Sequence, residues 1–133
     1  MIRIEHIGIA VSDMAKAEEI YTRLLGAPPY KREVVESEGV TTSFFQVGSS
    51  KIELLESTRS DGAVATFIAK RGEGMHHIAF EVEDIREEMA RLKSEGFQLL
   101  REEPHRGADN KLVCFVHPKS VNGVLVELTQ EIR

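Results

Sequence analysis

The chain has 133 residues, a net charge of −5, and hydrophobic and charged fractions of 41% and 29%, which fit one soluble globular domain. The acidic balance argues against a nucleic-acid partner, because such domains usually carry a basic face. The single cysteine, Cys114, excludes an internal disulfide and suits a reducing cytosol. No apolar run approaches the roughly 20 residues that span a bilayer, and no signal peptide precedes the first strand. We therefore expect a cytoplasmic protein without a membrane partner.

The first half of the chain predicts the element order β-α-β-β-β. A strand over about residues 3–11 leads into a helix that Ser12 or Asp13 caps and that Gly26 ends. The apolar face of this helix is expected to contain Met14, Ala17, Ile20, Tyr21 and Leu24. The other strands of this half are predicted at residues 30–35, 40–47 and 51–56.

The second half predicts the same order after a short connector helix. Asp84 opens its helix, with Glu87 three residues later as in a capping box, and Gly96 ends it. The strands are predicted at residues 75–82, 97–101, 112–117 and 124–129. We expect a single domain of residues 1–133 with three parts: module one at about 1–57, the connector at about 58–73 and module two at about 74–133.

Two copies of a histidine-bearing strand lie 71 residues apart (77 − 6), at residues 4–13 and 75–84. Side chains alternate between the faces of a strand, so His6 and His77 each share a face with small residues. The opposite faces are apolar and are expected to point into a core. They contain Ile7, Ile9 and Val11 in the first copy and Ile78, Phe80 and Val82 in the second. Each half thus presents one imidazole with room beside it.

A carboxylate strand also repeats, with Glu53 at 47 residues after His6 and Glu127 at 50 residues after His77. Each glutamate lies between apolar neighbours, where burial is costly unless another group compensates the charge. Two imidazoles and two carboxylates predict a metal site on a pseudo-twofold axis. The mixed N/O donors suit Co²⁺, Mn²⁺, Ni²⁺ or Zn²⁺, and the lack of thiolate argues against a closed structural zinc site.

Simpler interpretations compete with this one. A lone histidine on a strand is most often structural, and both glutamates would be ordinary surface residues if exposed. The match between the two halves favours a shared function for His6 and His77. His76 points away from its neighbour His77 along the pleat and is predicted not to be a ligand. Cations on the loops of the second half are candidates for an anionic substrate tail. They are Arg106, Lys111, His117 and Lys119.

The tandem βαβββ units, with His early and Glu late in each, resemble the vicinal oxygen chelate (glyoxalase/bleomycin resistance/dioxygenase) superfamily. The segments at 5–11, 51–55, 72–79 and 117–128 resemble methylmalonyl-CoA epimerases in particular. The resemblance implies an α+β fold in which the two modules form a curved mixed sheet around a metal cleft. It also implies His6, Glu53, His77 and Glu127 as ligands of one divalent ion per chain, Co²⁺ first, and an acyl-CoA substrate and a homodimer.

The implied reaction interconverts (2R)- and (2S)-methylmalonyl-CoA through a metal-stabilised enolate. Some relatives have Gln in place of Glu53 together with a candidate catalytic Glu in the strand that is 40–47 here, a strand that has no acidic residue. We therefore expect Glu53 and Glu127 to serve as both ligands and bases. The alternatives are glyoxalase I (lactoylglutathione lyase) and a non-catalytic module that binds a small molecule.

Overall fold

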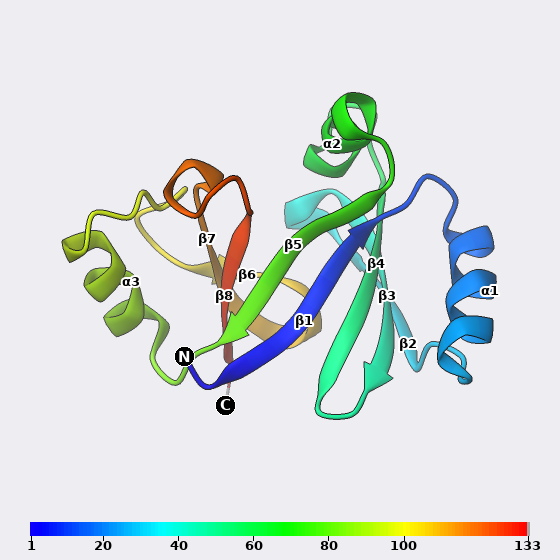
Figure 1. The fold of residues 1–133 in the computed structure, drawn as a ribbon, viewed down its shortest axis with the longest axis horizontal. Coiled ribbons are helices and arrows are strands. Elements are labelled where there is room, and N and C mark those ends of the chain that lie inside the picture. Colours follow the sequence, from blue (N-terminus) through cyan, green and yellow to red (C-terminus); the bar gives the residue numbers. More distant parts are fainter. Residues whose placement is uncertain (133) are drawn as a thin grey trace. The chain divides into compact units, whose positions relative to one another are not determined.

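The computed structural model describes residues 1–132 (Figure 1). The chain divides into two compact units: residues 6–76, and residues 1–5 with 77–133. Strand β1 (Arg3–Ala10) begins in the second of these units and continues into the first. The element order confirms an α+β fold built from two tandem modules, and the predicted connector helix is α2 (Ala63–Arg71). None of the helices within residues 1–132 is long and apolar enough to cross a membrane.

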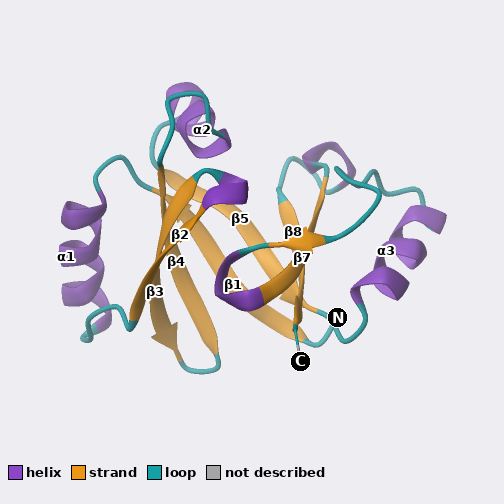
Figure 2. Cartoon of the chain, turned by 180° about the vertical axis from the view of Figure 1, so that it is seen from behind, coloured by secondary structure: helices purple, strands orange, loops and turns teal. Residues whose placement is uncertain are grey.

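The unit of residues 6–76 is a four-stranded mixed sheet with the strand order β2-β3-β4-β1. Strand β1 runs parallel to β4, whereas β3 is antiparallel to both β4 and β2. Its remaining elements are α1 (Met14–Leu25), β2 (Lys31–Val35), the 3₁₀ turn η1 (Glu36–Glu38), β3 (Val40–Val47) and β4 (Ser50–Ser57). Helix α1 lies along one face of this sheet (Figure 2).

Helix α1 has the predicted ends, and its apolar face contains three of the five predicted residues, Met14, Ala17 and Tyr21. The Asp13 side chain accepts a hydrogen bond from the Lys16 backbone N–H, and Gly26 closes the helix in the left-handed conformation that glycine adopts without strain. Ile20 and Leu24, predicted to be buried, are 52% and 70% exposed. The side chains that pack on the sheet are those of Met14, Ala17, Tyr21 and Leu25. They are spaced three, four and four residues apart. That spacing follows the 3.6-residue helical period more closely than the predicted face does.

The stripe of α1 packs on the apolar face of the sheet, against Phe45, Leu54 and Ile9. A polar contact on the sheet-facing side of the helix adds to this attachment. Glu18 accepts hydrogen bonds from Arg32 on β2 and from the Ser43 hydroxyl on β3, the latter at 2.7 Å. Apolar burial therefore attaches the helix to β1, β3 and β4, and the Glu18 carboxylate attaches it to β2 and β3.

The other unit is a second half-sheet with the order β5-β8-β7-β6. Its elements are β5 (Gly74–Glu81), α3 (Ile85–Ser94), β6 (His105–Arg106), the 3₁₀ turns η2 (Ala108–Asn110) and η3 (Pro118–Ser120), β7 (Lys111–Val116) and β8 (Val126–Glu131). As predicted, Asp84 caps α3, accepting a hydrogen bond from the Glu87 backbone N–H. The core beneath α3 contains Ile85, Met89, Leu92, Cys114, Val116 and Leu128.

The outer strand of this second sheet differs from the prediction. Residues 97–101 do not form a strand; they make one bridge, from Leu99 to Val116, while β6 falls inside the predicted loop and pairs with Leu112 and Val113. Residues 102–104 separate the two short pairings, and Pro104 within them has no N–H to donate. Pairing with β7 is thereby split in two.

Candidate active site

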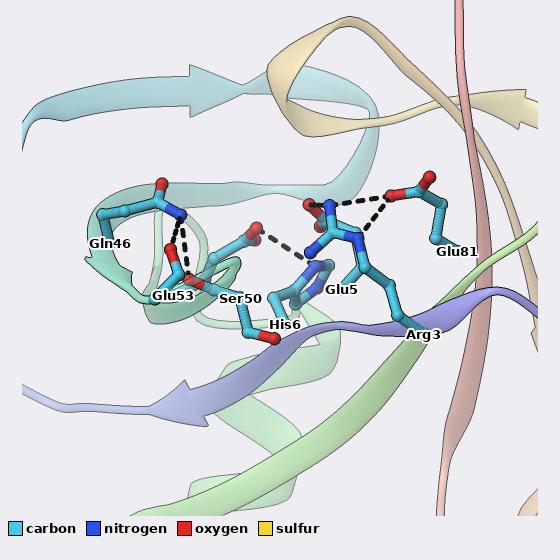
Figure 3. A network of polar contacts seen from close by, with 8 residues as sticks. Arg3, Glu5, His6, Gln46, Ser50, Glu53 and Glu81 are labelled. Atoms are coloured by element: carbon cyan, nitrogen blue, oxygen red, sulfur yellow. Dashed lines mark hydrogen bonds and ion pairs between the residues drawn. The ribbon is translucent and has the colours of Figure 1, made fainter.

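The first histidine–glutamate pair lies on adjacent parallel strands of the residue 6–76 unit. In the β1–β4 register, Gly8 is opposite Glu53, so His6 and Glu53 emerge on the same face of the sheet. His6 Nδ1 is 3.2 Å from Glu53 Oε2 (Figure 3). Both residues are only 4% exposed. These two predicted site residues therefore lie side by side within this unit.

The second pair repeats this arrangement in the other unit. Ala79 on β5 is opposite Glu127 on β8, and His77 Nε2 is 3.1 Å from Glu127 Oε1. Both residues are 6% exposed. His76, predicted not to be a ligand, places its ring against Phe67 at 5.0 Å between centroids. Each half of the chain thus holds one buried imidazole beside one buried carboxylate.

The face that carries each imidazole is itself buried, although the sequence suggested an open face. Ala10 and Ala79 are fully buried on these faces. The opposite faces pack on the helix-side cores, as predicted, through Ile9 in one unit and Ile78 and Phe80 in the other. Both faces of the central strands are therefore covered.

The chemistry of each pair fits a divalent first-row ion. Neutral imidazole nitrogens and carboxylate oxygens are the donors that such ions accept. A buried carboxylate needs a compensating positive charge or hydrogen bonds, and an ion would supply the charge. Because the set contains no thiolate, it is typical of open catalytic sites rather than of closed structural ones.

Sequence reasoning missed a phenylalanine beside each glutamate. Phe44 on β3 is directly opposite Glu53, and Phe115 on β7 is directly opposite Glu127. The two rings are 71 residues apart (115 − 44), as the two histidines are. In the second unit the ring of Phe115 meets His77 edge-on, with centroids 5.8 Å apart. The common offset was the signal in the sequence.

Lys51 and Thr42 were also missed, although they share the face of Glu53. Lys51 is opposite His6 in the register and is 7% exposed; Thr42 is 1% exposed. Within residues 1–132, the hydroxyls of Thr42 and of Thr129 in the other unit have no hydrogen-bond partner. A lysine that alternates with a glutamate is typical of a solvated strand, so the sequence gives no sign that Lys51 is buried.

His105 on β6 lies on the same face as Glu127. Its ring faces Phe115, with centroids 6.4 Å apart, and it is opposite Val113 in the β6–β7 register. Burial and the nearby Arg101 guanidinium lower the pKa of His105, against the opposing effect of the Glu127 carboxylate. Burial and Arg101 therefore disfavour the protonated form of this imidazole.

Further polar contacts near the strands join residues that lie close to one another and outside the His–Glu pairs. The Arg3 guanidinium binds Glu81 at 2.7 Å and lies 3.8 Å from the buried Glu5, and Gln46 closes the β3–β4 hairpin (Figure 3). Among the predicted loop cations, Arg106 donates a hydrogen bond to Asn110 at 3.0 Å. His117 Nδ1 accepts one from the Lys119 backbone N–H. These loop cations are not joined to either His–Glu pair by these contacts.

Comparison with known proteins shows which family shares this sequence and fold. A family model described as the Glyoxalase/Bleomycin resistance protein/Dioxygenase superfamily matches residues 5–115. Ethylmalonyl-CoA/methylmalonyl-CoA epimerase of Cereibacter sphaeroides is 42% identical, covering 96% of this chain and 97% of the relative. Protein YqjC of Bacillus subtilis, which is described as uncharacterized, is 41% identical, covering 98% of this chain and 93% of the relative.

The likeness extends to solved structures. Methylmalonyl-CoA epimerase in complex with methylmalonyl-CoA and NH₄⁺ superposes with a TM-score of 0.95 at 39% identity, covering 98% of this chain and 95% of that one. This agreement confirms the fold predicted from the tandem modules. The chain belongs to the Glyoxalase/Bleomycin resistance protein/Dioxygenase superfamily and, within it, to the family of methylmalonyl-CoA epimerases.

Proposed function

We propose that the protein is an epimerase that interconverts (2R)- and (2S)-methylmalonyl-CoA. The observation that supports this most is the pair of buried His–Glu sets, at 3.2 and 3.1 Å, in a chain about 40% identical to methylmalonyl-CoA epimerases. The glyoxalase I alternative is set aside, because these relatives act on acyl-CoA substrates. A non-catalytic binding module would have no use for four buried polar side chains, each costly to bury.

We propose further that His6, Glu53, His77 and Glu127 together hold one divalent ion, with Co²⁺ first and Mn²⁺, Ni²⁺ or Zn²⁺ as alternatives. The match between the halves supports this set, since each contributes the same two donors. When bound, the ion supplies positive charge that stabilises negative charge developing on the substrate oxygens.

The protein's own residues must move the proton. Breaking the C2–H bond transfers the proton to a carboxylate and leaves the electron pair delocalised over the thioester carbonyl. Returning a proton to the opposite face of C2 completes the epimerisation. We propose that Glu53 and Glu127 serve as the two bases, one for each face. No acidic side chain is present in β3 (Val40–Val47) to replace either of them.

The deciding experiment combines an activity assay with metal analysis. Purified protein loaded with Co²⁺ should interconvert the two epimers of methylmalonyl-CoA and should leave the glutathione hemithioacetal of methylglyoxal unchanged. The reverse result would make the protein a glyoxalase I. Activity on neither substrate, with no bound metal, would favour the binding module.

Single substitutions test the ligand set. His6→Ala and His77→Ala should each remove most of the metal and lower kcat/KM by at least about 100-fold. Folding should persist, because Ile9 and Phe80 in the apolar faces are untouched. His76→Ala is the matched control and should retain the metal. Full metal occupancy in both ligand variants would refute the assignment.

We also propose a cytoplasmic homodimer. Strands β2 and β6 are the outer strands of their half-sheets, and exposed sheet edges are usually paired or covered. Light scattering at micromolar concentration should give twice the chain mass of 14.9 kDa. A monomer across that range would contradict the proposal.

A further inference from the structure

A buried lysine beside the first His–Glu pair has no role in the function described above. Lys51 lies on β4 two residues before Glu53, and its backbone is opposite His6 in the parallel register. Its side chain therefore shares the face of both residues. The residue is 7% exposed, and a charged lysine is rarely buried this deeply unless another group compensates the charge.

The Lys51 ammonium group lies near an aromatic ring on the face that carries Glu53. Its Nζ lies 5.8 Å from the centroid of the Phe44 ring, and Phe44 is directly opposite Glu53 in the β3–β4 register. An ammonium group near an aromatic ring is stabilised electrostatically, and this stabilisation grows when the group is removed from water. The ring thus offsets part of the cost of keeping the cation on this face.

A second lysine near the same ring provides a contrast. Lys31 Nζ lies 5.1 Å from the Phe44 centroid, but its side chain is 37% exposed and its ammonium group is 3.3 Å from Glu33 Oε1. The two lysines therefore differ in their exposure to solvent. Lys51 shares the ring but is shielded from solvent on the face that carries the proposed ligands.

We propose that the Lys51 ammonium group binds the free carboxylate of the substrate and so selects 2-carboxyacyl thioesters over plain acyl thioesters. This inference rests on the proposed function. The two classes of thioester differ by one carboxylate, and charged hydrogen bonds are the strongest contacts available to recognise it. The same cation would oppose the negative charge that grows when C2 loses its proton.

Binding of two coenzyme A esters tests the proposal without turnover between epimers. Malonyl-CoA carries the free carboxylate and has no stereocentre at C2, whereas acetyl-CoA lacks the carboxylate. We expect Lys51→Met to weaken malonyl-CoA binding by about 10- to 100-fold and to change acetyl-CoA binding by less than about twofold. Lys51→Arg, which keeps the charge, should retain most of the preference. Calorimetry on the Co²⁺-loaded protein gives all of these constants.

Lys31→Met is the matched control, since it removes the other ammonium group near the same ring, and the preference for malonyl-CoA should persist. Metal content and thermal melting are measured for each variant, and Lys51→Gln replaces Lys51→Met if the latter does not fold. An unchanged preference in the uncharged variant, or an equal loss for both esters, would overturn the proposal in favour of a structural role. Failure of the epimerase function would appear separately, as a parent protein that does not interconvert the epimers.

Discussion

The two modules retain the same site but surround it differently. Each has a His–Glu pair, a phenylalanine opposite the glutamate and an aspartate that caps the helix. Module one adds a regular outer strand of five residues, whereas the outer strand β6 has two. The pairs also differ in orientation, because His6 approaches its glutamate through Nδ1 and His77 through Nε2.

The faces around the pairs differ in charge as well. Lys51 precedes Glu53 by two residues, and the corresponding residue before Glu127 is the apolar Leu125. On the neighbouring strands, Thr42 is opposite Glu33 in module one, while Val113 is opposite His105 in module two. This inequality fits the proposed role of Lys51, in which only module one binds the free carboxylate of the substrate.

The largest expected effect comes from testing whether the two glutamates are equivalent. Glu53→Gln and Glu127→Gln should each lower the rate of interconversion by at least about 100-fold, because one face of C2 loses its base. The metal should largely remain. In D₂O, the remaining base should still introduce deuterium at C2 of one epimer, and the two variants should label opposite epimers, as followed by NMR.

A different result would show that the glutamates of the two modules have different roles. If Glu53→Gln epimerises at close to the parent rate, Glu53 is only a ligand. The second base would then be another residue, an outcome consistent with the relatives that have Gln at this position. Loss of deuterium exchange into both epimers would mean instead that the two carboxylates act only together.

The second comparison concerns the cores. Leu54 on β4 and Leu128 on β8 are fully buried, one beneath α1 and one beneath α3. Truncation of either to alanine should lower the free energy of unfolding by about 2–5 kcal/mol. If the modules fold as one cooperative unit, urea unfolding of both variants should stay a single transition. Two transitions in either variant would show that the modules unfold separately.

Much of this fold follows from the sequence, because local signals and the repeat agree. The strand predicted at 40–47 is β3, and the capping aspartates set both helix starts. The predictions failed where tertiary context decides. The burial of Leu25 in place of Leu24 depends on how α1 is rotated on its sheet, and the short β6 depends on where Pro104 interrupts pairing. Lys51 was missed because a lysine's burial depends on what covers it.

The third comparison concerns the helix caps. Asp13 accepts a hydrogen bond from the Lys16 N–H at 3.2 Å, and Asp84 accepts one from the Glu87 N–H at 3.1 Å. Each Asp→Ala change should cost about 1 kcal/mol of unfolding free energy. Asp61 is the control: it precedes α2, but the N-cap there is Gly62 with no side-chain hydrogen bond. Asp61→Ala should lower the unfolding free energy by less than about 0.5 kcal/mol. A larger decrease would mean that Asp61 stabilises α2.

The smallest effect should come from the pH dependence of His105, which occupies the position in module two that Glu33 occupies in module one. Burial and Arg101 lower the pKa of His105 in the folded protein below its usual value of 6.5. The unfolded chain therefore binds more protons than the folded one between these two pKa values, so stability falls as the pH drops below about 6.5. His105→Gln removes this contribution, and its unfolding free energy should decrease less steeply than that of the parent between pH 7.5 and 5. A steeper decrease in His105→Gln would mean that the Glu127 carboxylate, which raises the pKa of His105, outweighs burial and Arg101.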